Sequence, residues 1–256
     1  MSVRNGERWV GEAVDSILGQ TFGDLEFIVV DDGSEDATGP ILEGRKDPRL
    51  RVIHQPPSGL TTSLNRAWRL SGAALLARMD ADDVAHPDRL ARQVTFLDAH
   101  PEVGLLGTGC RTISMSGEVI GVVVPPEDDA EIRRVLIRKN PFVHSSVMLR
   151  RKALEAAGGY DESLPVAQDY DLWLRMSRLT RMANLPEPLV TRRLTPGRVS
   201  SVRDTDRLRA EVAMKLRALQ NGAYPLWCAV FLLKPVVALA LPAALRRVVR
   251  GALSTG

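Results

Sequence analysis

Three carboxylates, Asp80, Asp82 and Asp83, follow an apolar run in the stretch RMDADD. Like charges at the end of a buried strand destabilise a fold unless a positive charge lies among them. Asp80 and Asp82 project to the same side of an extended backbone because they are two residues apart. Carboxylate oxygens at this spacing suit Mg²⁺ or Mn²⁺, which complete their shell with waters and substrate phosphate oxygens. We expect Arg78 to offset part of the negative charge.

A second acidic pair, Asp31-Asp32, follows the apolar run 25–30. Binding sites in open α/β sheets form beyond the carboxyl ends of the strands. A bare D-x-D is more often a solvated acidic turn, in this chain with Asp83 capping the next helix. Two acidic groups at neighbouring strand ends favour a binding site over that interpretation.

Alternating helix and strand patterns must position these carboxylates. Apolar residues at helical spacing predict helices at 7–20, 37–44, 59–71 and 87–99, and short apolar runs predict strands at 25–30, 50–54 and 73–79. This alternation predicts an α/β fold with a mostly parallel central sheet and helices on both faces. Further strands are predicted at 103–109, 111–114 and 119–124, with helices at 127–138 and from about 203 to 221.

The start of the chain departs from this pattern. A doubly wound sheet usually opens with a strand, yet MSVRNGE leads almost directly into the first predicted helix. We predict that the first strand is missing, because the natural product starts upstream or because Met1 is an internal methionine.

Composition limits the class of protein. With 256 residues, 45% hydrophobic and 25% charged, the chain can form one large domain or a domain with an appendage. The net charge of +3 is concentrated in short basic runs, which gives no indication of a nucleic-acid partner. Cys110 and Cys228 are the only cysteines, which excludes a disulfide framework or a zinc site and suits a reducing compartment. No signal peptide is recognisable, so we predict a cytoplasmic protein, located at the inner face of the cytoplasmic membrane.

The stretch 224–245 is apolar apart from Lys234. It could pack on the domain, cross the membrane or lie in the membrane interface. A spanning helix needs about 20 apolar residues, and Lys234 divides the stretch into two short halves. We favour an interfacial helix and predict peripheral membrane contact through 224–250, with Trp227, Phe231 and the tail arginines as anchors.

Four longer stretches resemble bacterial family 2 glycosyltransferases, which have the GT-A nucleotide-sugar-binding fold. Their order and spacing within residues 2–195 match the family: SVRNGERWVGEAVDSILGQTFGDLEFIVVDDGSEDAT, GLTTSLNRAWRLSGAALLARMDADDVAHPDRLARQ, HPEVGLLG and GGYDESLPVAQDYDLWLRM. The resemblance implies that a turn and the first acidic pair hold the base and ribose of the nucleotide, with Asp32 nearest the base. The residues of the turn and the pair are Val3, Arg4, Asn5, Asp31 and Asp32. The resemblance also implies ribose and metal binding by Asp80, Ala81 and Asp82, with Asp83 nearby. Gln168-Asp169 matches the motif that supplies the general base, Asp169.

The chemistry explains these residue types. Breaking the sugar C1–O bond leaves negative charge on the departing pyrophosphate, which a divalent cation, Mg²⁺ or Mn²⁺, neutralises. A carboxylate takes the proton of the attacking acceptor hydroxyl, and direct attack inverts the anomeric centre, as in the family. Asp169 could also be a helix N-cap, and the two roles are compatible. His144 is interpreted as a structural histidine in preference to a substrate contact.

The chain departs from the family at two further places. Gln168 stands where a glutamate is common, which removes a charge but leaves Asp169. Thr195 stands where many relatives carry a histidine ligand, so the metal would be held more loosely or Arg198 would reach the pyrophosphate instead.

These features predict residues 1–202 as a glycosyltransferase domain, divided into a nucleotide-sugar-binding half, 1–109, and an acceptor-binding half, 110–202. Residues 203–256 are predicted as a helical extension. The predicted activity is inverting, metal-dependent transfer from a nucleoside-diphosphate sugar, UDP-linked in our expectation, to a saccharide or lipid-linked saccharide in bacterial surface polysaccharide synthesis. Two alternatives stay open: a nucleotidyltransferase and a non-catalytic nucleotide-sugar-binding protein.

Overall fold

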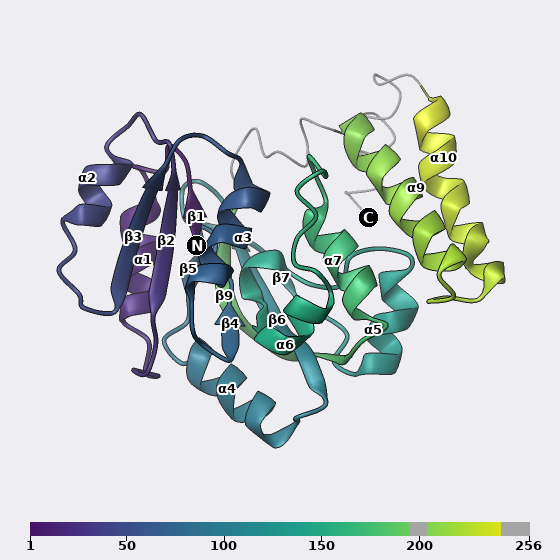
Figure 1. The fold of residues 1–256 in the computed structure, drawn as a ribbon, viewed down its shortest axis with the longest axis horizontal. Coiled ribbons are helices and arrows are strands. Elements are labelled where there is room, and N and C mark those ends of the chain that lie inside the picture. The colour runs from purple at the N-terminus through teal and green to yellow at the C-terminus, as the bar shows by residue number, and fades with distance from the viewer. Residues whose placement is uncertain (195–203, 242–256) are drawn as a thin grey trace.

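The computed structural model describes residues 1–194 and 204–241 of the chain. Its N-terminal part is a parallel three-stranded sheet, in the order β1-β2-β3, with helices beside it (Figure 1). Its elements are β1 (Ser2–Val3), α1 (Val10–Leu18), β2 (Phe27–Asp32), α2 (Thr38–Glu43), β3 (Leu50–Gln55) and α3 (Leu60–Leu70).

The burial of apolar residues explains how the elements of the N-terminal part pack together. Every residue of β2 is buried, as expected for the central strand of a sheet that is covered on both faces. The buried residues of α1 recur at spacings of three and four along one face of the helix: Val10, Ala13, Val14 and Ile17. This face packs in one hydrophobic cluster with Val29 and Leu42.

The prediction that the first strand is missing was wrong. Ser2 and Val3 form the two-residue strand β1, which pairs with Val30 and Asp31 of β2. Ser2 also forms an isolated parallel bridge with Asp80. The strand is short because a turn follows it at once, and α1 begins only at Val10. β1 therefore lies between the two acidic groups of the sequence.

The second sheet has the order β4-β8-β6-β9-β5, with β7 paired to β6. Only β6 and β9 are parallel, so the expectation of a mostly parallel sheet holds for the first sheet and was wrong for the second. The elements are β4 (Leu75–Ala77), β5 (Val84–Ala85), α4 (Arg89–Ala99), β6 (Val103–Ile113), β7 (Val119–Val123), α5 (Asp129–Leu136), η1 (His144–Ser146), β8 (Met148–Arg150), α6 (Arg151–Ala156), α7 (Gln168–Met176) and β9 (Arg181–Arg193).

Long-range pairing produces this mixed sheet. β4 pairs with β8 in an antiparallel register, in which Leu76 lies opposite Leu149. β6 runs from Val103 to Ile113 as one strand, although two were predicted, and crosses the predicted boundary at 109/110. That division into halves remains a prediction.

The C-terminal helices pack on the second sheet's side of the molecule (Figure 1). They are α9 (Asp204–Gln220), η2 (Leu226–Leu232) and α10 (Leu233–Ala240), and α9 confirms the helix predicted from about 203 to 221. Met214 and Ala218 of α9 belong to the same core cluster as the fully buried Trp173. None of the helices in 1–194 and 204–241 combines the length and apolar character needed to cross a membrane.

Candidate active site

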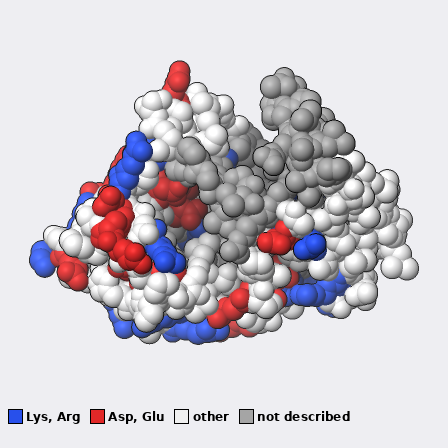
Figure 2. Space-filling model, turned by 90° about the horizontal axis from the view of Figure 1, so that it is seen from above, with Lys and Arg blue, Asp and Glu red and all other residues white. Residues whose placement is uncertain are grey.

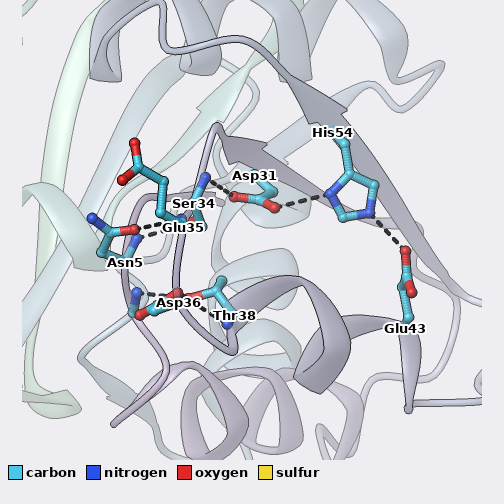
Figure 3. Close-up of polar contacts among 9 residues, drawn as sticks. Asn5, Asp31, Ser34, Glu35, Asp36, Thr38, Glu43 and His54 are labelled. Atoms are coloured by element: carbon cyan, nitrogen blue, oxygen red, sulfur yellow. Dashed lines mark hydrogen bonds and ion pairs between the residues drawn. The ribbon is translucent and has the colours of Figure 1, made fainter.

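Asp31 is the penultimate residue of β2, and its carboxylate is engaged on both oxygens (Figure 3). Its Oδ1 accepts a hydrogen bond from the Ser34 backbone N–H at 3.1 Å, and its Oδ2 lies 2.9 Å from His54 Nδ1. The other ring nitrogen, Nε2, lies 3.2 Å from Glu43 Oε1. The imidazole thus joins a buried carboxylate to a surface one, an arrangement that the sequence did not indicate.

Asp32 ends β2 and accepts three hydrogen bonds from its own chain. The donors are Gln55 Nε2 at 2.7 Å, the Ser58 N–H at 2.8 Å and the Gly59 N–H at 2.8 Å. Burial raises the pKa of Asp32, but the hydrogen bonds outweigh burial and the pKa lies below 3.8. Asp32 therefore fixes the loop before α3, where Gly59 adopts φ 92°. Its contact with a nucleotide base remains a prediction.

The predicted nucleotide turn lies against the loop after β2 (Figure 3). The Asn5 N–H donates to Ser34 Oγ at 3.0 Å, and Asn5 Oδ1 accepts from the Glu35 N–H at 2.9 Å. Asn5 has φ 51°, a left-handed conformation that is uncommon for a residue other than glycine. Val3 is buried in β1, whereas Arg4 is exposed. The turn is thus held in place beside Asp31, with Arg4 at the surface.

The acidic stretch after β4 contains a buried cation. Arg78 has a side chain only 6% exposed and forms an ion pair with Asp80 through Nη2 and Oδ1. This contact confirms the expectation that Arg78 offsets the charge of the stretch. Ala81 and Asp82 are half-buried beside it. Because Ser2 bridges to Asp80 and Val3 pairs with Asp31, the two acidic groups lie on opposite sides of β1.

Asp83 is the most buried of these carboxylates, with 1% of its surface exposed. Its Oδ1 accepts a hydrogen bond from the Arg193 N–H at 3.2 Å, which ties the acidic stretch to the end of β9. Burial and the charge of Asp80 raise the pKa of Asp83 to about 7. Asp83 precedes β5 and does not cap α4, for which Asp88 is the N-terminal flanking residue.

Asp169 is the second residue of α7 and not its N-cap, a position that Ala167 holds with φ 58°. Backbone strain of this kind at a non-glycine residue is often found at functional sites. Asn140 Nδ2 donates a 2.7 Å hydrogen bond to Asp169 Oδ2. Burial raises the pKa of Asp169, while hydrogen bonds and the charge of Arg78 oppose the rise. Gln168 is half-buried at the start of the helix.

His144 and Tyr160 form a pair within the electrostatic influence of Arg78. His144 Nε2 lies 2.9 Å from the Tyr160 hydroxyl, and the His144 and Trp173 rings meet edge to face. Burial and the charge of Arg78 hold the pKa of His144 well below 6.5, so the imidazole is neutral at physiological pH. These contacts support its interpretation as a structural histidine.

The charge of Arg78 acts on residues from both parts of the chain. It opposes the rise that burial causes in the pKa of Asp83 and of Asp169, and Asp80 and Tyr160 raise the pKa of Arg78 against the effect of burial. Asp80 contacts the guanidinium directly, and Asp83 and Asp169 are within its electrostatic influence. Figure 2 shows acidic side chains gathered in the left part of the face seen there, some of them in a hollow. Thr195 and Arg198 lie outside the described residues.

The carboxylates of the acidic stretch fit a divalent cation whose coordination shell is completed by substrate. Among residues 1–194 and 204–241, no three His, Cys, Asp or Glu side chains are grouped to hold a metal ion by themselves. Asp80 and Asp82 supply hard carboxylate oxygens, and Mg²⁺ is commonly bound through one or two carboxylates together with substrate phosphates. The residues present are compatible with that arrangement.

Asn140 and Arg89 were missed from the sequence. Asn140 is 29 residues from the carboxylate that it contacts. Arg89 is fully buried, and its Nη2 donates to the Arg78 carbonyl at 2.7 Å. The short distance in sequence between Arg89 and the acidic stretch could have indicated its involvement, but the sequence pattern did not reveal that Arg89 is buried.

A match to known proteins defines the class. The family model described as glycosyl transferase family 2 matches residues 1–158, and the chain belongs to this family. An uncharacterized glycosyltransferase of Haemophilus influenzae is 32% identical over 211 residues, which cover 77% of this chain and 65% of that relative. The O-antigen biosynthesis glycosyltransferase WbnJ of Escherichia coli is 31% identical over 76% of this chain and 78% of its own. The amylovoran biosynthesis glycosyltransferase AmsE of Erwinia amylovora is 29% identical over 82% of this chain and 81% of its own.

Solved structures share the fold at low sequence identity. S. aureus TarS 1-349 in complex with UDP-GlcNAc is 20% identical, with a TM-score of 0.67 over 83% of this chain and 64% of that one. The mannosyltransferase PcManGT from Pyrobaculum calidifontis, in complex with GDP-Man and Mn²⁺, is 21% identical, with a TM-score of 0.65 over 100% of this chain and 79% of that one. The fold is therefore the GT-A fold expected from the sequence.

Proposed function

We propose that this protein is an inverting, metal-dependent glycosyltransferase that moves a sugar from a nucleoside-diphosphate sugar to an acceptor hydroxyl. The observation that carries the proposal is the acidic stretch after β4, where Asp80 pairs with the buried cation Arg78, and Asp83 and Asp169 are within the electrostatic influence of that cation. Raised carboxylate pKa values, as those of Asp83 and Asp169, are a recurring property of catalytic sites. Membership of family 2 supports the same conclusion.

Asp169 is the proposed general base. An acceptor hydroxyl becomes an effective nucleophile when a carboxylate takes its proton during attack. The raised pKa of Asp169 strengthens it as a base, while Arg78 opposes the rise and favours the ionised form. Asn140 orients the carboxylate through its 2.7 Å hydrogen bond. Direct attack from the face opposite the nucleotide gives inversion.

Asp80 and Asp82 are the proposed metal ligands. When bound, Mg²⁺ or Mn²⁺ would supply a Lewis acid that neutralises charge on the departing nucleoside diphosphate. The residues proposed for nucleotide binding are Val3, Arg4, Asn5, Asp31, Asp32, Asp80 and Ala81. The engagement of Asn5 and Asp31 by the loop after β2 supports a preformed edge of such a site.

UDP is the nucleotide that we propose for the donor. TarS structures contain UDP and UDP-GlcNAc, and the PcManGT structure contains GDP-Man and Mn²⁺. WbnJ and AmsE are named for O-antigen and amylovoran biosynthesis. We therefore propose a saccharide or lipid-linked saccharide acceptor in bacterial cell-surface polysaccharide synthesis.

We also propose that residues 224–250 contact the inner face of the cytoplasmic membrane. Leu226, Trp227 and Leu233 are 78%, 69% and 63% exposed. Figure 2 shows few charged side chains in the right-hand part, where α9 and α10 lie in Figure 1. Residues 216–256 contain no acidic residue and have these basic ones: Arg217, Lys234, Arg246, Arg247 and Arg250. An apolar surface with adjacent positive charge suits an anionic membrane.

Vesicle flotation tests the membrane contact. The parent protein should float with vesicles that contain anionic phosphatidylglycerol, and Leu226→Ser with Trp227→Ser should remain at the bottom of the gradient. Val122→Ser is the matched control, because Val122 is 54% exposed but lies on β7. Equal flotation of the parent and the double variant would refute the proposed contact.

A donor screen tests the activity. UDP-, GDP- and dTDP-sugars are added with Mn²⁺ or with chelator, and both hydrolysis and protection against thermal unfolding are measured. We expect release of a nucleoside diphosphate with a UDP-sugar and Mn²⁺. Release of pyrophosphate would identify a nucleotidyltransferase. Metal-dependent UDP binding without turnover on a broad acceptor panel would identify a non-catalytic binding protein.

A further inference from the structure

Arg78 is held rigidly beneath the acidic stretch. Its backbone N–H donates to the Val147 carbonyl at 2.9 Å, and its own carbonyl accepts from Arg89 Nη2 at 2.7 Å. Arg89 is fully buried and also donates from Nε to Gln93 Oε1 at 3.1 Å. The backbone that carries the guanidinium therefore has little freedom to move.

The guanidinium itself is incompletely paired. Nη2 contacts Asp80, but Nε and Nη1 are buried without a hydrogen-bond partner in the part of the chain that the structure describes. A buried charged group with unsatisfied donors is energetically costly. The ion pair with Asp80 therefore satisfies only part of the guanidinium.

Asp80 belongs at the same time to the pair of carboxylates proposed to hold the metal. Its side chain is 36% exposed, whereas that of Arg78 is 6% exposed, so Asp80 lies between the buried cation and the accessible side of the site. A divalent ion that binds Asp80 and Asp82 must approach a fixed positive charge. The ion pair therefore opposes metal binding both by repulsion and by occupying Asp80 Oδ1.

We propose that Arg78 is a built-in counter-ion of Asp80 that competes with the metal for this carboxylate. Without a metal Arg78 neutralises Asp80, and metal binding requires Asp80 to turn from the guanidinium to the ion. Arg78 is then a positioning residue that sets metal affinity and keeps the acidic stretch compact without a metal. This inference rests on the proposed function.

The test is calorimetric Mn²⁺ binding to the full chain in the presence of UDP. Arg78→Gln should bind Mn²⁺ about tenfold more tightly than the parent, because a charge-assisted contact and a repulsion are removed. Its turnover should nevertheless fall. Arg78→Lys keeps the charge and should stay within about twofold of the parent affinity. Arg111→Gln, an exposed arginine on β6, is the surface control.

The outcomes separate the possible failures. Unchanged or weaker Mn²⁺ binding by Arg78→Gln would overturn the counter-ion role and leave the proposed function intact. Absence of Mn²⁺-dependent UDP binding in the parent would overturn both. In the parent, the Arg78 Nε–H resonance, assigned by its loss in Arg78→Lys, should shift on adding Mg²⁺ and UDP. An unshifted resonance at saturating Mg²⁺ and UDP would overturn the competition for Asp80 even if Arg78→Gln fails to fold.

Discussion

The two acidic groups of this protein occupy similar places in the fold but differ in how they are stabilised. Asp31 and Asp32 end β2, and their oxygens accept hydrogen bonds from Ser34, Gln55 and the loop before α3. The group after β4 contains the buried cation Arg78, which is paired with Asp80, and the pKa of Asp83 is raised. The first group is thus stabilised by neutral hydrogen-bond donors, whereas the second depends on a buried ion pair.

We expect the first group to stabilise the fold and the second to be stabilised by a bound cation. Hydrogen bonds that lower the pKa of Asp32 stabilise the folded state whenever the carboxylate is ionised. Carboxylates with raised pKa values are destabilising when ionised, and a bound cation would relieve that cost. Position at a strand end does not distinguish the groups, whereas the kind of partner does.

Asp169→Asn should give the largest effect. Asparagine keeps the size of the side chain and can accept the hydrogen bond from Asn140, but it cannot take a proton. We expect kcat/KM for sugar transfer to fall by about 10³ with the melting temperature little changed. Asp98→Asn on α4, an exposed site, is the control. Retention of more than a tenth of the parent turnover would refute the base assignment.

Asp32→Asn should produce the largest loss of stability. The asparagine amide cannot replace a carboxylate that accepts three hydrogen bonds, so the free energy of unfolding should fall by about 2–4 kcal/mol at pH 7. Because the folded pKa lies below the unfolded value of 3.8, the deficit is full above that value and shrinks as the pH falls through the folded pKa. Urea titrations at pH 7 and at acid pH measure it. A pH-independent deficit would contradict this explanation.

Asp83→Asn should increase the stability of the protein, in contrast to Asp32→Asn. The ionised Asp83 is buried, and its folded pKa of about 7 lies above the unfolded value of 3.8. Removal of the charge should stabilise the ligand-free protein by about 1–2 kcal/mol at pH 8, since the asparagine oxygen can still accept from the Arg193 N–H. The gain should decrease as the pH falls from 7 towards 3.8. Thermal unfolding across this range checks the sign, and destabilisation at pH 8 would count against it.

His54→Gln should have the smallest effect. The imidazole is half exposed, with 46% of its side chain accessible, and its contact with Glu43 is at the surface. A glutamine can donate to Asp31, so we expect a stability loss below about 1 kcal/mol. A loss above about 2 kcal/mol in urea titration would show that the first group depends on the imidazole more than its exposure suggests.

Apart from β1, the sequence predicted the N-terminal part well, because its strands and helices alternate with clear periodicity. The second sheet was predicted less well. β9 was missed because Pro186 and Pro188 argue against a strand, yet it pairs with β6 where the register shifts around Gly109. The antiparallel pairing of β4 with β8 depends on segments about 70 residues apart, which local patterns cannot reveal.

Within the site, local relations were predictable and long-range ones were not. Arg78 was identified as the partner of the acidic stretch because it lies two residues from Asp80. The different surroundings of Asp32 and Asp83 were not foreseen, since their partners come from other segments: Gln55, Ser58, Gly59 and Arg193. The metal-binding and catalytic roles remain predictions that the following measurement addresses.

The most direct test of the account is calorimetric titration of UDP into the parent and Asp82→Asn, with Mn²⁺ and with chelator. If the group after β4 holds a metal–nucleotide complex, the parent should bind UDP at least about tenfold more tightly with Mn²⁺. That difference should disappear in Asp82→Asn. Equal UDP affinity with Mn²⁺ and with chelator in the parent would contradict the central claim.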